Sequence, residues 1–112
     1  MSKALVIIGG QGSGKTTKAI AAAKAVGSYV FLNYHSLKSR FELGSALEKS
    51  PACVIVEEAP LRLLEDPIIK GLVSNDKIVI ERKGQDPMDV DAPEKWIFTV
   101  QLDSRRFDVE CV

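Results

Sequence analysis

A glycine-rich segment between an apolar run and an alanine-rich stretch constrains the fold of this chain more than any other feature. Residues 9–16 read Gly-Gly-Gln-Gly-Ser-Gly-Lys-Thr and match the pattern G-x-x-x-x-G-K-[ST] at every fixed position. The preceding run, Ala4–Ile8, is typical of a parallel strand that is covered on both faces. Lys15–Val26 has helical spacing, and Gly27 follows it as a C-cap would. The sequence therefore predicts a strand, a phosphate-binding loop and a helix in succession.

The predicted loop supplies the groups that bind a nucleoside triphosphate. Its glycines allow backbone N–H groups to point inward, and the helix N-terminus adds partial positive charge. We expect Lys15 to reach the β- and γ-phosphates, and the Thr16 hydroxyl to coordinate Mg²⁺. The predicted ATP-binding residues are Gly9, Gly10, Gln11, Gly12, Ser13, Gly14, Lys15, Thr16 and Thr17. ATP and Mg²⁺ are thus the expected cofactors.

Two carboxylates follow another apolar run, Ala52–Val56. Because the carboxyl ends of parallel strands share one edge of a sheet, Glu57 and Glu58 should lie at the edge that also carries the loop. We expect Glu57 to hold Mg²⁺, directly or through water, and Glu58 to orient and polarise the attacking water. The alternative is a pair of charges that simply ends a strand.

The remaining pattern predicts one three-layer α/β domain over residues 1–112, with a mainly parallel sheet. The other expected elements are strands at Tyr29–Leu32 and Lys77–Ile80, one broken or two short helices within Ser36–Lys49, and a helix over Leu61–Val73 that Asp66-Pro67 restarts. Gly84–Lys95 reads as an acidic exposed loop. Alternation through Trp96–Leu102 and again through Phe107–Cys111 predicts a C-terminal antiparallel hairpin at the edge of the sheet.

Composition restricts the class of protein this chain can be and the kinds of partner it can bind. With 112 residues, of which 46% are hydrophobic, the chain suits one globular domain and excludes a two-domain enzyme. Fifteen basic residues balance fifteen acidic ones, so net charge supports neither nucleic-acid nor membrane binding. The lone histidine, His35, argues against a histidine-based metal site. Cys53, inside an apolar run, favours a reduced thiol, and the N-terminus leaves no room for a signal peptide, so we expect a cytoplasmic protein.

Together, the loop and the acidic pair resemble P-loop NTPases of the additional-strand, catalytic-glutamate (ASCE) division. The resemblance implies the sheet order 5-1-4-3-2, with Lys77–Ile80 as the strand between the first and third, and a water-activating role for Glu58. The chain departs from that division at Glu57, where Asp is usual. Residues 54–59 and 96–105 are also similar to FtsK/HerA-type DNA translocases and zonula-occludens-toxin-like phage proteins, which implies that Gln85 senses the γ-phosphate.

The end of the chain has a further resemblance. Arg105-Arg106-Phe107 resembles the end of superfamily 3 viral helicase cores, which implies that Arg105 or Arg106 serves a neighbouring subunit's site. The leading expectation is a minimal ATPase that works as a homo-oligomer or with a larger partner protein, in a nucleic-acid translocating or remodelling assembly. A small-molecule kinase is one alternative, although the chain lacks an evident arginine-rich lid. A nucleotide-dependent adaptor without turnover is the other, favoured by Glu57 in place of Asp.

Overall fold

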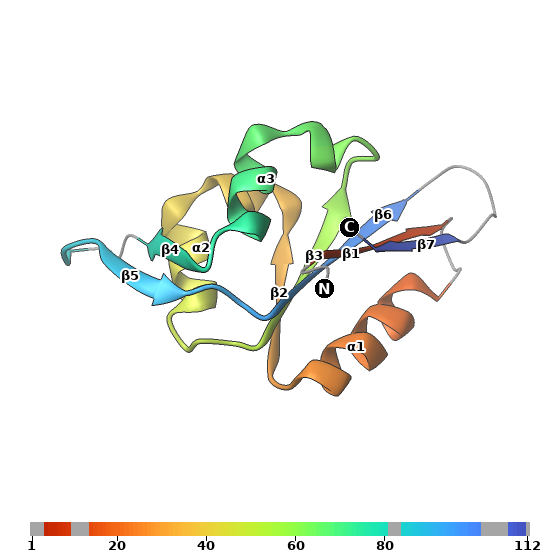
Figure 1. Cartoon of the computed structure of the whole chain (residues 1–112), viewed down its shortest axis with the longest axis horizontal. Coiled ribbons are helices and arrows are strands. Elements are labelled where there is room, and N and C mark those ends of the chain that lie inside the picture. Colours follow the sequence, from red (N-terminus) through yellow and green to blue (C-terminus); the bar gives the residue numbers. More distant parts are fainter. Residues whose placement is uncertain (1–3, 10–13, 81–83, 102–107, 112) are drawn as a thin grey trace.

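A mainly parallel sheet forms the centre of the computed structural model, which describes residues 4–9, 14–80, 84–101 and 108–111 (Figure 1). Its strands, in spatial order, are β2 (Tyr29–Asn33), β3 (Cys53–Ala59), β6 (Lys95–Gln101), β1 (Ala4–Gly9) and β7 (Asp108–Cys111). The first four are parallel, and β7 runs antiparallel to β1 at the edge. The predicted α/β class and the mainly parallel sheet are confirmed.

Short helical segments and one separate pair of strands surround this sheet. They are α1 (Lys15–Val26), η1 (Tyr34–Lys38), α2 (Arg40–Leu47), η2 (Leu63–Glu65), α3 (Pro67–Ser74), β4 (Lys77–Ile80) and β5 (Met88–Asp91). The bounds predicted for α1 are confirmed, and so is the restart at Asp66, whose side chain accepts the backbone N–H of Ile68 at 2.9 Å. Across the described ranges, no helix is both long and apolar enough to cross a membrane.

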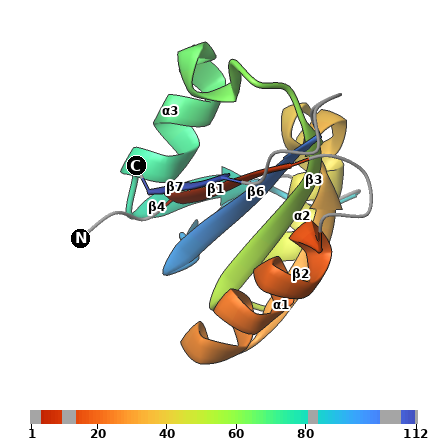
Figure 2. The same cartoon turned by 90° about the vertical axis from the view of Figure 1, so that its right-hand side faces the viewer.

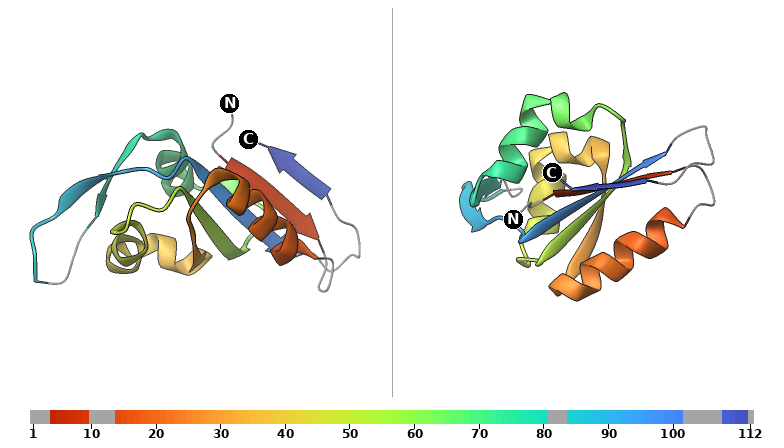
Figure 3. Two further views of the ribbon diagram at one scale, coloured as in Figure 1. Left: turned by 90° about the horizontal axis from the view of Figure 1, so that it is seen from below. Right: turned by 45° about the vertical axis from the view of Figure 1, so that its right-hand side comes forward.

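Helix α1 covers one face of the sheet, on the side opposite α3 (Figures 2 and 3). Its Ala19 and Ala23 are fully buried against side chains of that face. The sheet residues of this cluster are Leu5, Ile7, Cys53, Ile55 and Ile97. Because alanine adds only one carbon beyond the backbone, α1 can lie close to the strands.

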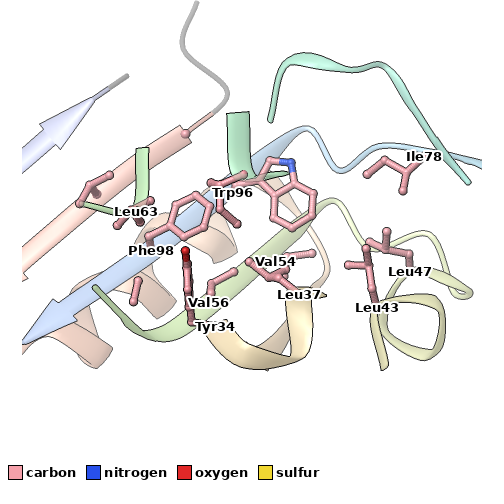
Figure 4. Close-up of a cluster of buried hydrophobic side chains, with 14 of the residues drawn as sticks. Tyr34, Leu37, Leu43, Leu47, Val54, Val56, Leu63, Ile78, Trp96 and Phe98 are labelled. Carbon is pink, nitrogen blue, oxygen red and sulfur yellow. The ribbon is translucent and has the colours of Figure 1, made fainter. Parts of the chain in front are cut away.

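The other face carries the larger cluster, drawn in Figure 4. Trp96 and Phe98 of β6 stack with ring centroids 6.5 Å apart, and Val54 and Val56 of β3 lie in the same cluster. The elements between β3 and β6 contribute Leu63, Ile69, Ile78, Ile80 and Val90 to it, and η1 and α2 contribute Tyr34, Leu37, Leu43 and Leu47. Helical segments η1 and α2, together with the described elements between β3 and β6, thus cover this face of the sheet.

The strand between β1 and β3 is not the predicted one. Lys77–Ile80, expected there, instead forms β4 and pairs antiparallel with β5, outside the main sheet. The exposure of β4 alternates, with Lys77 and Val79 exposed, whereas Trp96–Val100 of β6 is buried throughout. A strand in the middle of a sheet covered on both faces needs buried side chains in both directions, and of β4 and β6 only β6 meets that requirement. With β6 as fourth strand, the order is 5-1-4-3-2.

Two further expectations at the C-terminal end are wrong. The predicted hairpin does not form, because both edges of β6 are occupied by β1 and β3 and the last strand, β7, pairs with the open edge of β1. β7 is nevertheless an antiparallel edge strand, as expected. The predicted loop Gly84–Lys95 contains β5, whose Val90 is buried in the core cluster.

Candidate functional site

The candidate site lies at the edge of the sheet where the four parallel strands end. β1 ends at Gly9, which pairs with Gln101 at the end of β6, and β2 ends at Asn33, which pairs with Glu57 of β3. Parallel strands place their carboxyl ends on one edge, so these residues share it. The prediction that the glycine-rich loop and the acidic pair meet at one edge is confirmed for the described residues of both.

Helix α1 begins after a glycine in a left-handed conformation. Gly14 precedes the helix with φ 83° and ψ 19°, in the left-handed region, and its carbonyl accepts the first helical bond from the Lys18 N–H at 3.1 Å. The first turn contains no acidic residue. Lys15 is partly buried, whereas Thr16 and Thr17 are exposed. Residues 10–13, the rest of the predicted loop, lie outside the described residues.

The acidic pair lies on a β-bulge. Between the pairs Val56–Phe98 and Ala59–Val100, β3 advances by three residues while β6 advances by two. Glu58 has φ 59°, in the left-handed region that residues other than glycine rarely adopt. Glu57 is partly buried, and Glu58 is exposed. The hydroxyl of buried Thr99 lies 3.5 Å from the carbonyl oxygen of Val56, immediately before the bulge.

Asn33 links the second strand to the acidic pair. Its Nδ2 donates to Oε2 of Glu58 at 2.9 Å, and its Oδ1 accepts the backbone N–H of His35 at 2.9 Å. The second bond caps η1. The Asn33 side chain therefore holds Glu58 on one side and is itself held by the backbone on the other.

The other predicted site residues do not join this group. Gln85 is exposed beside the turn of the β4–β5 hairpin, which Figure 1 shows at the end of the molecule opposite the start of α1. Its expected position depended on β4 being the central strand, so this expectation fails with that assignment. Arg105 and Arg106 lie outside the described residues.

A family model matches residues 7–106, which include the candidate site. The chain belongs to DUF5906, a family of unknown function. A search of curated proteins found no match. Membership in DUF5906 thus assigns no activity to the candidate site.

The donor set of this DUF5906 chain suits a hard cation bound together with phosphates. In the part of the chain that is described, no three or more His, Cys, Asp or Glu side chains gather into a metal site. Mg²⁺ at phosphate sites needs few protein ligands, because phosphate oxygens and water complete its octahedron. The Thr16 hydroxyl and the Glu57 carboxylate are oxygen donors of the kind that Mg²⁺ takes at such sites.

Sequence reasoning missed two residues at this edge. Asn33 was left outside the strand Tyr29–Leu32, although it ends an apolar run in the same way as Glu57 does. Gln101 was assigned to a hairpin, and it is in fact exposed at the end of the strand between β1 and β3. The signal for a central strand was the run Trp96–Phe98, whose successive apolar side chains point to both faces of a strand.

Proposed function

We propose that this chain binds MgATP at the carboxyl edge of its sheet and hydrolyses it, as a P-loop NTPase of the ASCE division with a three-layer fold. One observation carries the proposal: Gly9, which ends β1 ahead of the predicted loop, and the Glu57–Glu58 pair of β3 share one sheet edge, with only β6 between β1 and β3. Neighbouring strands are about 4.8 Å apart, so β1 and β3 are separated by roughly 10 Å. That spacing leaves room for a triphosphate and its cation.

The residues have distinct roles in this proposal. Lys15 and the backbone N–H groups at the start of α1 bind the β- and γ-phosphates. Thr16 and Glu57 hold Mg²⁺, which draws charge from the phosphate oxygens when it is bound. Glu58 accepts a proton from the water that attacks the γ-phosphorus, and the bond to the β-phosphate oxygen breaks to release ADP. The left-handed backbone of Glu58 supports a functional role, because such strain is concentrated at active sites.

We assign the γ-phosphate contact to Gln101 in place of Gln85. Gln101 ends the strand between β1 and β3 and pairs with Gly9, the residue where the phosphate loop begins. The exposed side chain of Gln101 offers an amide N–H to a phosphate oxygen. The proposal keeps Arg105 or Arg106 as the residue that completes a neighbouring subunit's site in an assembly, where nucleic acid is the candidate substrate.

Calorimetric titration with MgATP tests the proposal, with Lys15→Ala compared against Lys24→Ala. Both substitutions remove one positive charge from α1, but Lys24 lies in the last turn and is exposed. We expect Lys15→Ala to weaken binding at least tenfold, or about 1.4 kcal/mol, and Lys24→Ala to leave it within twofold. Unchanged affinity in folded Lys15→Ala would refute the phosphate-loop assignment.

A phosphate-release assay then separates the proposed activity from the alternatives. Release of phosphate from ATP alone supports the ATPase. ADP formation that requires an added acceptor indicates a kinase, and tight binding without any release indicates an adaptor.

A further inference from the structure

We infer that the groove between α3 and β4 binds an extended apolar peptide of a partner protein, which adds to the edge of β4 as a further strand. The groove has a volume of about 570 Å³ and is lined by residues of η1, α2, α3 and β4. The described residues of the candidate nucleotide site are not among its lining. The inference therefore does not depend on the proposed ATPase function.

The groove is apolar on its buried and on its exposed sides. Leu37 and Leu43 line it and are buried in the larger core cluster, which Figure 4 shows together with Ile78 of β4. The two walls of the groove carry side chains that are half-exposed, since Ile68 of α3 is 52% exposed and Val79 of β4 is 54% exposed. Exposed apolar side chains that gather around a groove are typical of a surface that a partner covers.

One backbone edge of β4 is not occupied by any described strand, because β4 pairs with β5 alone. The Ala92 N–H donates to the Asp76 carbonyl at 2.8 Å, so these two residues form a hydrogen-bonded pair of the antiparallel ladder. Such pairs alternate along a ladder, so Ile78 bonds to β5, whereas the N–H and C=O groups of Lys77 and Val79 point away from it. Within the described part of the chain, the backbone of neither residue bonds to another segment.

This free edge faces the groove. Lys77, Ile78 and Val79 all line the groove, whereas no residue of β5, which is described in full, does so. A peptide strand placed antiparallel beside β4 exchanges two N–H···O=C bonds with Lys77 and two with Val79. Strand addition of this kind takes its affinity from main-chain bonds and its specificity from pockets for alternate side chains.

An extended peptide fits the groove better than a second copy of the chain does. The edge of β4 lies between two elements of its own chain, with α3 across the groove and β5 on the other side. A second copy that offered its own β4 edge would bring its α3 and β5 into the same space. A single extended strand carries no such neighbours, so we assign the groove to a peptide.

The register on β4 defines two apolar positions of the peptide. Residues directly opposite each other on paired strands share one face. The peptide residue opposite Ile78 therefore points to the buried side of the groove and must be apolar. The peptide residue opposite Val79 lies beside an exposed apolar side chain, which favours a second apolar residue there.

The charge of Lys77 defines the third position. Among the described residues that line the groove, Lys77 is the only charged one. Its ion pair with Asp91 is 3.8 Å long, and the two side chains are 71% and 84% exposed, so this pair holds Lys77 weakly. An acidic residue opposite Lys77 complements its charge, whereas a lysine on an edge strand disfavours pairing with other strands. In the chain direction of an antiparallel peptide, the expected order is apolar, apolar, acidic.

Calorimetric titration of the full chain with the acetylated and amidated peptide Thr-Thr-Val-Leu-Glu-Thr-Thr tests the inference. In the proposed register the N–H groups of the peptide's valine and glutamate face β4, and that of its leucine faces away. We expect N-methylation at the glutamate to weaken binding roughly tenfold or more, and N-methylation at the leucine to leave it within about threefold. Equal or reversed effects would overturn the proposed pairing with β4.

Two matched proline variants test the same edge from the protein's side. Proline is tolerated on an edge strand where the N–H faces away from the ladder, which holds for Val79 and for its ladder partner Asp89. Val79→Pro should abolish peptide binding, and Asp89→Pro should leave the affinity within about twofold. Lys77→Glu should weaken binding about two- to fivefold and should favour the peptide with lysine in place of glutamate.

The other outcomes decide against the inference. Wild-type protein that shows no binding up to about 1 mM peptide would overturn it, and so would unchanged affinity in folded Val79→Pro. Sedimentation of the free chain supplies a further test. A dimer that Val79→Pro dissociates would assign the groove to a second copy and overturn the peptide.

Discussion

Alanine at Gly14 and alanine at Gly71 should shift stability in opposite directions. A Cβ added at either glycine meets no atom within 4 Å, so neither substitution creates a clash. The two positions differ in backbone conformation, since Gly14 has φ 83° whereas Gly71 lies in α3 without a positive φ. Comparing them isolates the cost of the left-handed turn into the candidate phosphate site.

The magnitudes follow from the two conformations. A side chain in the left-handed region costs roughly 1–2 kcal/mol, and replacing glycine lowers the entropy of the unfolded chain, which returns about 0.4–1 kcal/mol. Gly14→Ala should therefore lose about 1 kcal/mol of unfolding free energy. Gly71→Ala should gain about 0.5–1 kcal/mol, the usual preference for alanine within a helix.

Differential scanning calorimetry measures this difference. For a domain of this size, 1 kcal/mol corresponds to roughly 4 °C in Tm, so the two variants should differ by about 6–8 °C. The wild-type Tm should lie between them. Equal increases in Tm for both variants would refute the left-handed conformation of Gly14 and the turn that starts α1.

Three further expectations concern the acidic pair, the buried thiol and the C-terminal arginines. Glu58→Gln should retain MgATP binding and lower turnover about 100-fold or more, whereas Glu57→Gln should raise the Mg²⁺ requirement; a phosphate-release assay with Mg²⁺ titration giving the reverse pattern would exchange their roles. Burial raises the pKa of the Cys53 thiol from 9.0 to about 11. The thiol therefore ionises more readily in the unfolded chain, and the free energy of unfolding should fall as pH rises from 9 to 11. Urea unfolding of Cys53→Ala should show a smaller fall over the same pH range. Alanine at both Arg105 and Arg106 should flatten the rise of specific activity with protein concentration, and full activity of a sedimenting monomer would contradict a role in a neighbouring site.

The sequence predicted correctly those strands and helices whose formation depends only on their own residues. The run Ala4–Ile8 and the spacing within Lys15–Val26 predicted β1 and α1 because burial on two faces and helical periodicity are properties of those residues alone. The acidic pair was found for a similar reason, since two charges follow the buried run directly, although β3 continues through them to Ala59. These elements contribute Gly9, Gly14 and Glu57 to the candidate site.

Pairing between distant segments was harder to predict. Both Lys77–Ile80 and Trp96–Val100 have strand-forming residues, and the choice of central strand depends on which one is covered on both faces after folding. The role predicted for Gln85 failed because it assumed that Lys77–Ile80 was the central strand. The bulge at Glu58 and the hydrogen bond between Glu58 and Asn33 could not be predicted from the sequence either, because both depend on the register between neighbouring strands.

The strand β6 connects the core to the chemistry of the proposed site. Its Trp96 and Phe98 are buried in the larger core cluster, while its Ile97 lies in the cluster beneath α1. Any shift of β6 would therefore disturb packing on both faces, which holds Gln101 in register with Gly9. On the α1 side, the fully buried Ala19 and Ala23 bring the helix close to the sheet. Close approach of α1 and a fixed β6 therefore keep the ends of the strands, where the proposed site lies, in a fixed arrangement.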